Sequence, residues 1–343
     1  MTIDMHSHLR PAALIEPLRA RTTPPMIVTG DDGQEYLKGR SGGMTPLAEA
    51  FDDIEERLAT MDRCGISTAA LSLFGGFQWI EALPLAEGLP LIRLHNDTLA
   101  ATCRKYPGRF IAYATLPLGD MDAAVAEFER VMEIEGFVGA IVPGNAFLTI
   151  ADTAAYRPLL AAANRRRAVL FIHWGPRPGD AWPRVPADAD NWTPRLITLD
   201  MQAALSANML TLTHSHLLEE YPDAYFHVHN LGGNFAFELE RLDHRNPLDT
   251  PAEPEPSSLV ARPNLYVDCN SLGRMAIEIG TEVYGSHRIM FGTDGTEFGN
   301  NWSLKALAEA RITDADRRAI LHDNAARILG HLAPLAPYQA AAE

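Results

Sequence analysis

The sequence predicts an α/β protein, a (β/α)8 TIM barrel with a small β-hairpin insertion after the first strand. Three observations support this fold. Eight short apolar runs recur along the 343 residues, and segments with helical apolar spacing separate them. The first run ends in His-Ser-His at residues 6–8, not in a glycine-rich turn. Alternating strands and helices imply a parallel sheet, and the missing glycine motif favours a barrel over an open doubly wound sheet.

Each predicted strand is a short apolar run, and each predicted helix lies between two such runs. The strands comprise residues 2–5, 67–73, 110–118, 137–142, 168–173, 225–229, 265–269 and 288–292. The helices comprise residues 47–64, 91–105, 121–135, 153–166, 193–220, 235–242, 275–284 and 304–310. Because a TIM barrel has eight strands and tolerates insertions, residues 1–343 are expected to form one domain.

Two segments interrupt this repeat. Residues 12–46 follow the first strand, and residues 25–37 within them are predicted to form a hairpin that turns at Asp31 to Gly33. Residues 175–191, rich in Pro, Asp and Trp, follow the fifth strand. Both are expected on the catalytic face, where the hairpin either covers the site or only decorates the fold. Residues 335–343 are predicted to be an Ala-rich tail.

The composition narrows the expected partners and location. The net charge is −15 and the basic residues form no long run, so nucleic acid is not an expected partner. Cys64, Cys103 and Cys269 are too scattered for a disulfide framework or a four-thiolate zinc site. The chain shows no export signal and no uninterrupted apolar stretch of about 18 residues, so we expect a cytoplasmic protein outside the membrane.

His6 and His8 flank Ser7 at the end of the first predicted strand. Side chains two positions apart on a strand point to the same side, so both imidazoles can reach one metal ion. Imidazole is a common ligand of divalent first-row ions, and barrel active sites lie at the carboxyl ends of the strands. Taken alone, the pair fits two solvated loop histidines equally well.

His173 ends the fifth predicted strand, and Asp294 lies at the end of the eighth, which closes the barrel beside the first. Each residue has a structural alternative, since a strand-end His is often structural and an Asp often caps a turn. Their common location with His6 and His8 predicts a site for one divalent metal ion.

With these residues, the chain resembles the amidohydrolase superfamily, in particular the branch that contains aminocarboxymuconate semialdehyde decarboxylase and gamma-resorcylate decarboxylase. The shared motifs lie at residues 3–8, 106–110, 171–173, 232–237 and 291–294. They extend over nearly the whole chain and are specific to the branch, but not to one substrate. The resemblance implies one bound ion, zinc or alternatively manganese, with His6, His8, His173 and Asp294 as its ligands.

The resemblance also implies a catalytic His on the sixth strand, ahead of a double glycine. Counting back from Gly232 and Gly233 reaches Asn230, one residue after His229. We assign the role to His229, which a one-residue bulge would bring into position, and we expect Asp294 to share the proton transfer. If Asn230 fills the position instead, the site has only an amide there for contact with the substrate.

Four further residues are candidates for substrate contact. Arg10 could bind a carboxylate through both of its terminal nitrogens, although it also fits a solvated loop. Asn145 resembles a substrate-contacting position of the branch, but it also suits a turn beside Pro143. Trp174 and Phe77 could wall an aromatic substrate, and ordinary packing is their alternative.

By resemblance, the leading hypothesis is non-oxidative decarboxylation of a small unsaturated or aromatic carboxylic acid, in the catabolism of aromatic compounds. One alternative is metal-dependent hydrolysis or hydration of a ring-cleavage, amide or lactone substrate. Another is a barrel that serves only as a scaffold, because a fold does not determine a reaction. The resemblance also suggests a homodimer.

Overall fold

The structure is a computed structural model that describes residues 1–40, 43–73, 77–183, 192–295, 300–333 and 335. Its parallel eight-stranded sheet has the order β1-β5-β6-β7-β8-β9-β10-β11. The strands are β1 (Thr2–Leu9), β5 (Ile66–Leu73), β6 (Phe110–Ala114), β7 (Phe137–Pro143), β8 (Val169–His173), β9 (Tyr225–Val228), β10 (Leu265–Asp268) and β11 (Ile289–Met290). The Met5 N–H donates to the Phe291 carbonyl, and the Asp294 N–H donates to the His6 carbonyl. These bonds close the sheet, and the predicted α/β barrel is confirmed.

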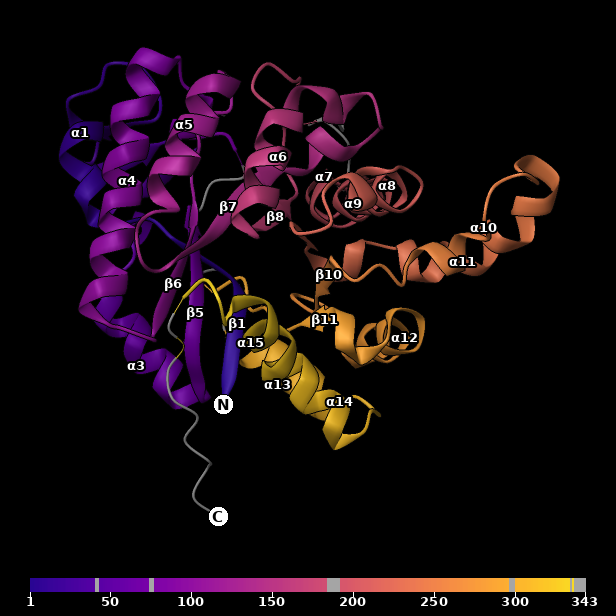
Figure 1. The fold of residues 1–343 in the computed structure, drawn as a ribbon. Coiled ribbons are helices and arrows are strands. Elements are labelled where there is room, and N and C mark those ends of the chain that lie inside the picture. The colour runs from indigo at the N-terminus through magenta and orange to yellow at the C-terminus, as the bar shows by residue number, and fades with distance from the viewer. Residues whose placement is uncertain (41–42, 74–76, 184–191, 296–299, 334, 336–343) are drawn as a thin grey trace.

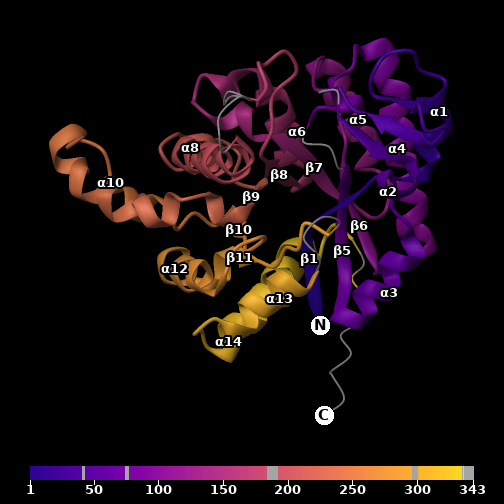
Figure 2. The ribbon, with the colours of Figure 1, turned by 180° about the vertical axis from the view of Figure 1, so that it is seen from behind.

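Helical segments surround the strands (Figure 1). The first half contains η1 (Ala12–Leu14), α1 (Ile15–Arg19), α2 (Leu47–Ala50), α3 (Ile54–Cys64), η2 (Ile80–Ala82), α4 (Leu85–Lys105), α5 (Met121–Val131), η3 (Gly144–Phe147), η4 (Asp152–Tyr156) and α6 (Arg157–Arg166). The second half contains α7 (Trp192–Pro194), η5 (Arg195–Asp200), α8 (Met201–Thr213), α9 (Leu217–Glu220), η6 (Asn230–Gly232), α10 (Phe235–Asp249), α11 (Pro256–Leu259), α12 (Arg274–Tyr284), η7 (Ser286–Arg288), α13 (Asn300–Glu309), α14 (Asp314–Arg318), η8 (Ala319–Asp323) and α15 (Asn324–Leu329). The early helix α3 contacts the late helix α13, so the outer layer also closes (Figure 2).

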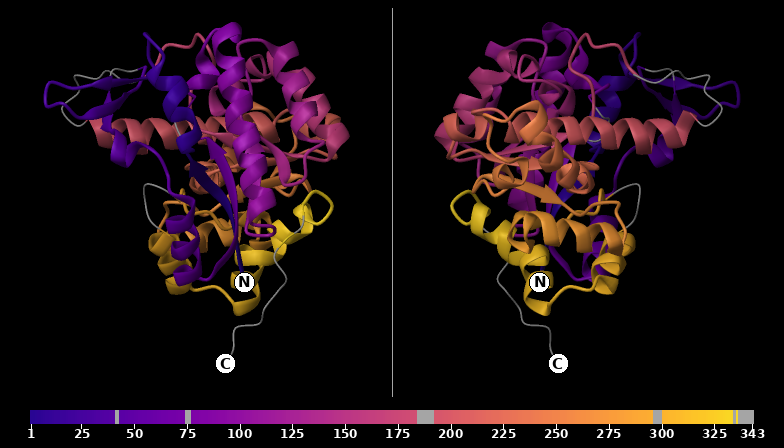
Figure 3. Two further views of the ribbon diagram at one scale, coloured as in Figure 1. Left: turned by 90° about the vertical axis from the view of Figure 1, so that its left-hand side faces the viewer. Right: turned by 90° about the vertical axis from the view of Figure 1, so that its right-hand side faces the viewer.

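The predicted hairpin after β1 is confirmed and gains a third strand. Strands β2 (Met26–Thr29), β3 (Glu35–Lys38) and β4 (Met44–Pro46) form a small antiparallel sheet. Ile27 and Leu37 are paired across it, and both side chains are buried in a cluster that includes Leu73 and Ile92. Because Leu73 ends β5, this sheet lies beside the carboxyl end of the barrel, away from the N-terminus (Figure 3).

Several element boundaries differ from the predicted ones for local reasons. The predicted helix over 47–64 is two helices, because Asp53 caps a new one by accepting hydrogen bonds from the N–H groups of Glu55 and Glu56. The predicted helix over 193–220 is divided into α7, the π-helical η5, α8 and α9. The third strand was predicted to reach residue 118 but ends at Ala114, because the Asn96 amide pairs with the backbone of Thr115.

Parts of two predicted segments outside the barrel are not among the residues that the structure describes. Residues 184–191 of the predicted 175–191 segment, and residues 336–343 of the predicted tail, lie outside the described residues. Among the described helices, none combines the length and apolar character needed to cross a bilayer.

Candidate metal centre and active site

His6 and His8 lie on β1 with both imidazoles directed to the same point. Their Nε2 atoms are 3.2 Å apart, and the two side chains are almost fully buried. The β1–β5 pairing is irregular between Asp4 and Ser7, but the alternation still leaves Ser7 on the other side of the strand, where it accepts a hydrogen bond from Arg57. The pattern that predicted a shared direction for the two histidines therefore agrees with the geometry.

Asp294 approaches the histidine pair from the end of the barrel's last segment. Its Oδ1 atom is 3.1 Å from His8 Nε2 and 3.7 Å from His6 Nε2. The residue has a φ of 62°, and its N–H donates to the His6 carbonyl. An Asp tolerates this left-handed conformation better than most side chains, and such strain is common in active sites. The same bond that closes the barrel thus brings a carboxylate to the histidines.

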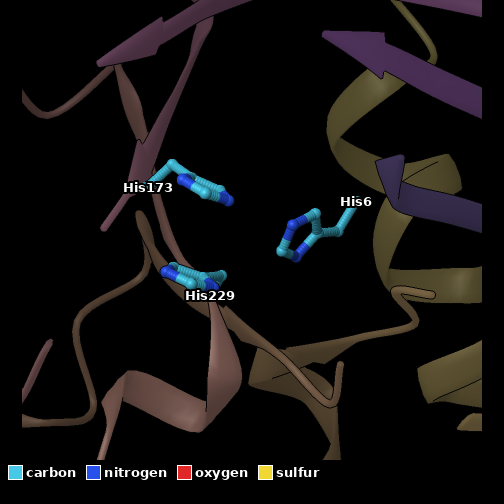
Figure 4. Close-up of side chains that lie close together, drawn as sticks. All are labelled: His6, His173 and His229. Carbon is cyan, nitrogen blue, oxygen red and sulfur yellow. The ribbon is translucent and has the colours of Figure 1, made fainter. Parts of the chain in front are cut away.

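His173 and His229 form the opposite wall of the site. Their rings are stacked with centroids 4.4 Å apart and an interplanar angle of 5°. The His173 ring is also 5.3 Å from that of His6 and 5.0 Å from that of His8, measured between centroids. Figure 4 shows both stacked rings facing His6. Ligand atoms of His6, His173 and His229 lie within 4.8 Å of one another, and so do those of His6, His8 and Asp294.

The hydrogen bonds fix the tautomers of the histidines. His6 Nδ1 lies 3.1 Å from Asp268 Oδ2, and His173 Nδ1 lies 3.0 Å from the Trp174 carbonyl. Both partners accept hydrogen bonds, so each Nδ1 carries the proton and each Nε2 presents a lone pair.

The same reasoning applies to His8. Its Nδ1 is 2.8 Å from the Ser72 hydroxyl, which donates its own hydrogen to the Ser7 carbonyl. Ser72 must therefore accept from His8 Nδ1, which leaves the lone pair on Nε2. Electron-rich atoms of three imidazoles and one carboxylate then converge, and this donor set fits a divalent cation.

The pKa directions favour neutral rings at His8 and His173 and a charged ring at His6. Burial lowers the pKa of His8 and lowers that of His173 well below its usual value. Burial also acts to lower the pKa of His6, but Asp268 and Asp294 outweigh it and raise that pKa. The two carboxylates thus favour a positive charge at His6, although the ring itself is fully buried.

Asp268, at the end of β10, is a site residue that the sequence analysis missed. Its Oδ2 accepts from His6 and also lies 2.8 Å from His227 Nε2. Its Oδ1 accepts the backbone N–H groups of Asn230 and Asn270. A carboxylate behind a metal-binding imidazole orients the ring and raises its basicity. The only sequence signal was an Asp at the end of a predicted strand.

The structure places His229, rather than Asn230, against the other histidines. His229 directly follows β9 and is still extended, and Asn230 then has a φ of 51°. This turn directs the Asn230 side chain to Asn270, which donates to its Oδ1 and also to Asp294. The His229 Nε2 accepts the Trp174 N–H, so its Nδ1 carries the proton and lies 3.2 Å from Asn230 Oδ1. Burial lowers the pKa of His229 to about 3.

The other predicted substrate contacts lie at different distances from this cluster. Phe77 is buried with its ring centroid 6.3 Å from that of His173, and Trp174 packs against Trp182 beside the same strand end. Asn145 is buried and donates to Asp180. Arg10 donates to the Ala50 carbonyl at the end of α2 and lies over the Trp79 ring.

The sequence is similar to known decarboxylases over most of its length. An amidohydrolase family model matches residues 3–331. A gamma-resorcylate decarboxylase of Rhodococcus jostii is 31% identical over 303 residues, which cover 82% of this chain and 88% of the relative. A 2-amino-3-carboxymuconate-6-semialdehyde decarboxylase of Dictyostelium discoideum is 22% identical over 248 residues, which cover 71% and 66%.

Solved structures share the fold at lower identity. The 2,6-dihydroxybenzoate decarboxylase from Rhizobium superposes with a TM-score of 0.70 at 22% identity and covers 96% of this chain and 98% of its own. The 5-carboxyvanillate decarboxylase from Sphingomonas paucimobilis gives 0.71 at 22% identity, with coverages of 95% and 98%. A dihydroxybenzoic acid decarboxylase from Polaromonas with bound manganese gives 0.70 at 23% identity, with 96% of each chain covered. From the match over residues 3–331 and the 31% identity to a full-length relative, this chain belongs to the amidohydrolase family.

Proposed function

We propose that this chain is a metal-dependent, non-oxidative decarboxylase of a small aromatic carboxylic acid. The proposal rests chiefly on the convergence of lone pairs from His6, His8 and His173 with the carboxylate of Asp294. Its substrate class rests on the relatives, which are named for the decarboxylation of aromatic acids such as gamma-resorcylate and 5-carboxyvanillate. An intact donor set argues against the alternative of a barrel that serves only as a scaffold.

We assign one divalent ion to His6, His8, His173 and Asp294. When bound, it would supply Lewis acidity that draws negative charge from a substrate oxygen. Zinc and manganese both accept imidazole and carboxylate ligands, and the relative with bound manganese supports manganese. Asp268 and Ser72 would hold the His6 and His8 rings so that their Nε2 atoms stay directed at the ion.

Asp294 and His229 are the groups that we expect to handle the proton. In the reaction, the bond between the ring carbon and the carboxylate breaks, carbon dioxide leaves, and a proton takes its place on that carbon. The His residues around Asp294 lower its pKa against the effect of burial, so it starts as a carboxylate. It would take a proton from a substrate hydroxyl or a water and pass it to the ring carbon. His229, neutral, would donate from Nδ1 to a substrate oxygen in place of Asn230 Oδ1, which lies 3.2 Å from it.

The remaining candidates are assigned to the walls of the site. Phe77 and Trp174 are the aromatic side chains near His173 that would enclose a ring. Asn145, Asn230 and Arg10 remain predicted contacts, and the insertion over residues 12–46 is proposed to cover the catalytic face. The homodimer remains a prediction, for which molecular mass from light scattering is the test.

Metal content and carbon dioxide release test this function together. The purified protein should hold about one equivalent of zinc or manganese and release carbon dioxide from hydroxybenzoates. His173→Ala should lose both properties, and His216→Ala, which changes an exposed histidine, should keep both. A folded wild-type protein that binds no divalent ion would refute the proposal. Addition of water to the substrate without carbon dioxide release would favour a hydrolase or hydratase instead.

A further inference from the structure

A small cavity of about 10 Å³ lies at the carboxyl ends of β5, β6 and β7, and it has room for about one water-sized atom. Leu73, Phe77 and Ile141 contribute to its apolar walls, and Glu81 and Thr115 add polar groups. Phe77 lines the cavity, and its ring centroid is 6.3 Å from that of His173 in the candidate metal centre. Leu73 directly follows Ser72, whose hydroxyl holds His8.

Two buried oxygen atoms in this cavity have no hydrogen-bond partner among the described residues. The Glu81 side chain is 5% exposed, and its Oε1 accepts the Trp79 N–H at 3.4 Å while its Oε2 accepts nothing. The Thr115 Oγ1 is buried and equally without a partner. Leaving such groups unpaired is costly, so a polar atom of a water or a ligand is expected between them.

The polar groups of the cavity are held in place by their neighbours. The Asn96 side chain donates to the Thr115 carbonyl and accepts the Thr115 N–H, and Asn96 is itself bound by Glu127. The backbone of Thr115 is therefore fixed while its hydroxyl remains available. Burial raises the pKa of Glu81 to about 7, against the attraction of Arg40. The carboxyl can thus donate as well as accept at neutral pH.

We propose that this cavity binds a hydroxyl group on the aromatic ring of the substrate, through Glu81 and Thr115. The inference rests on the proposed function, because the metal centre would hold the carboxylate end of the same ring. The small volume and apolar walls suit a compact neutral group, and a hydroxyl both donates and accepts. Glu81 and Thr115 are therefore residues that determine which hydroxylated acid is preferred.

Substrate preference of the metal-loaded enzyme is the test. The probes are 2-hydroxybenzoate and the dihydroxybenzoates that add one hydroxyl at each remaining ring position. The wild type should have a kcat/KM for one dihydroxybenzoate that is about tenfold or more above that for 2-hydroxybenzoate. A factor of this size is what one buried hydrogen bond to an ionisable group contributes. Glu81→Leu should remove most of that preference, Thr115→Val part of it, and Glu81→Gln little of it, because an amide still donates and accepts.

Controls separate this role from a structural one. Glu49→Leu, at an exposed residue of α2, should leave the preference as it is. Melting temperatures identify any loss of fold, and a structural role for Glu81 would lower kcat/KM for all the acids without changing their ratio. An unchanged ratio in Glu81→Leu, or a wild type without any preference, would mean that the cavity holds only a buried water. A wild type that decarboxylates none of the acids would refute the proposed function as well.

Discussion

At the scale of single residues, Asp268 offers the sharpest test of the metal centre. It accepts hydrogen bonds from His6, His227 and two backbone N–H groups while fully buried. Asp268→Asn keeps the shape but replaces an acceptor oxygen by an amide nitrogen, so His6 loses its anionic partner. We expect an affinity for manganese or zinc that is about 10–100-fold weaker, measured by calorimetry. Asp249→Asn, on an exposed ion pair of α10, is the control. Equal affinities in both variants would exclude a positioning role for Asp268.

His229 should separate catalysis from metal binding. Its Nε2 accepts the Trp174 N–H, and its protonated Nδ1 lies 3.2 Å from Asn230 Oδ1. Neither nitrogen therefore presents a lone pair to an ion, and Nδ1 can exchange Asn230 for a substrate oxygen. His229→Asn should therefore retain about one equivalent of metal, while the rate of carbon dioxide release falls by about 10²–10⁴-fold, as for a lost general acid or hydrogen-bond donor. Loss of the metal in this variant would make His229 a ligand and contradict the assignment.

Residues at strand ends were predictable, and residues that depend on tertiary contacts were not. His6, His8, His173 and Asp294 were chosen because barrel topology brings strand ends together. In the structure they belong to two groups that share His6, one with His8 and Asp294 and the other with His173 and His229. The choice between His229 and Asn230 needed the φ of 51° at Asn230, which no pattern of residue types reveals. Glu81 gave no signal, because its burial arises from a short helix packed against distant segments.

At the scale of elements, Gly233 tests how the segment after β9 packs against α8. A Cβ atom there would lie 2.2 Å from the Gln202 carbonyl and 2.8 Å from the Ser206 nitrogen, and the φ of Gly233 is +72°. Gly233→Ala should lower the free energy of unfolding by about 3 kcal/mol, through strain and the displaced helix. Gly273→Ala, whose Cβ would meet nothing within 4 Å, should change it by about 0.5 kcal/mol or less. Urea denaturation measures both, and equal effects would mean that the segment adjusts freely.

The elements themselves were predicted better than their ends. All eight strands fall where short apolar runs indicated, since burial in a barrel requires such runs. The ends depend on side chains that compete with the regular pattern, such as Asp53 at the start of α3 and Asn96 after β6. Strand β4 was missed because its three residues, Met44 to Pro46, are too few to show alternation.

At the scale of the whole molecule, the closed barrel followed from counting strands, but the arrangement of its outer segments did not. Figure 1 shows α10 extending away from the strands, with Phe237 on it 77% exposed. The predicted helix over 235–242 is the first part of α10, which continues to Asp249. Helical spacing in the sequence does not indicate whether a helix covers the sheet or projects from it, because both cases present some apolar residues to solvent.

The burial of histidines should make the stability of the whole molecule depend on pH. His95 on α4 is fully buried, and burial lowers its pKa from 6.5 to about 4. Between these values the unfolded chain takes up a proton at this residue that the folded chain does not, so stability is full above pH 6.5 and falls as the pH drops towards 4. The slope is about 1.4 kcal/mol per pH unit for one such group.

His95→Phe isolates that contribution from the groups that act in the opposite direction. Burial raises the pKa of Glu81 to about 7 and that of Asp4 to about 6. At these two groups the folded protein becomes less stable as the pH rises. Such groups are shared by the wild type and the variant, and their effects cancel in the difference. Urea midpoints at pH 7 and pH 5 should show that the variant loses about 2 kcal/mol less than the wild type over this interval. Equal losses would mean that His95 becomes protonated inside the folded barrel, which requires water or a partner to reach it there.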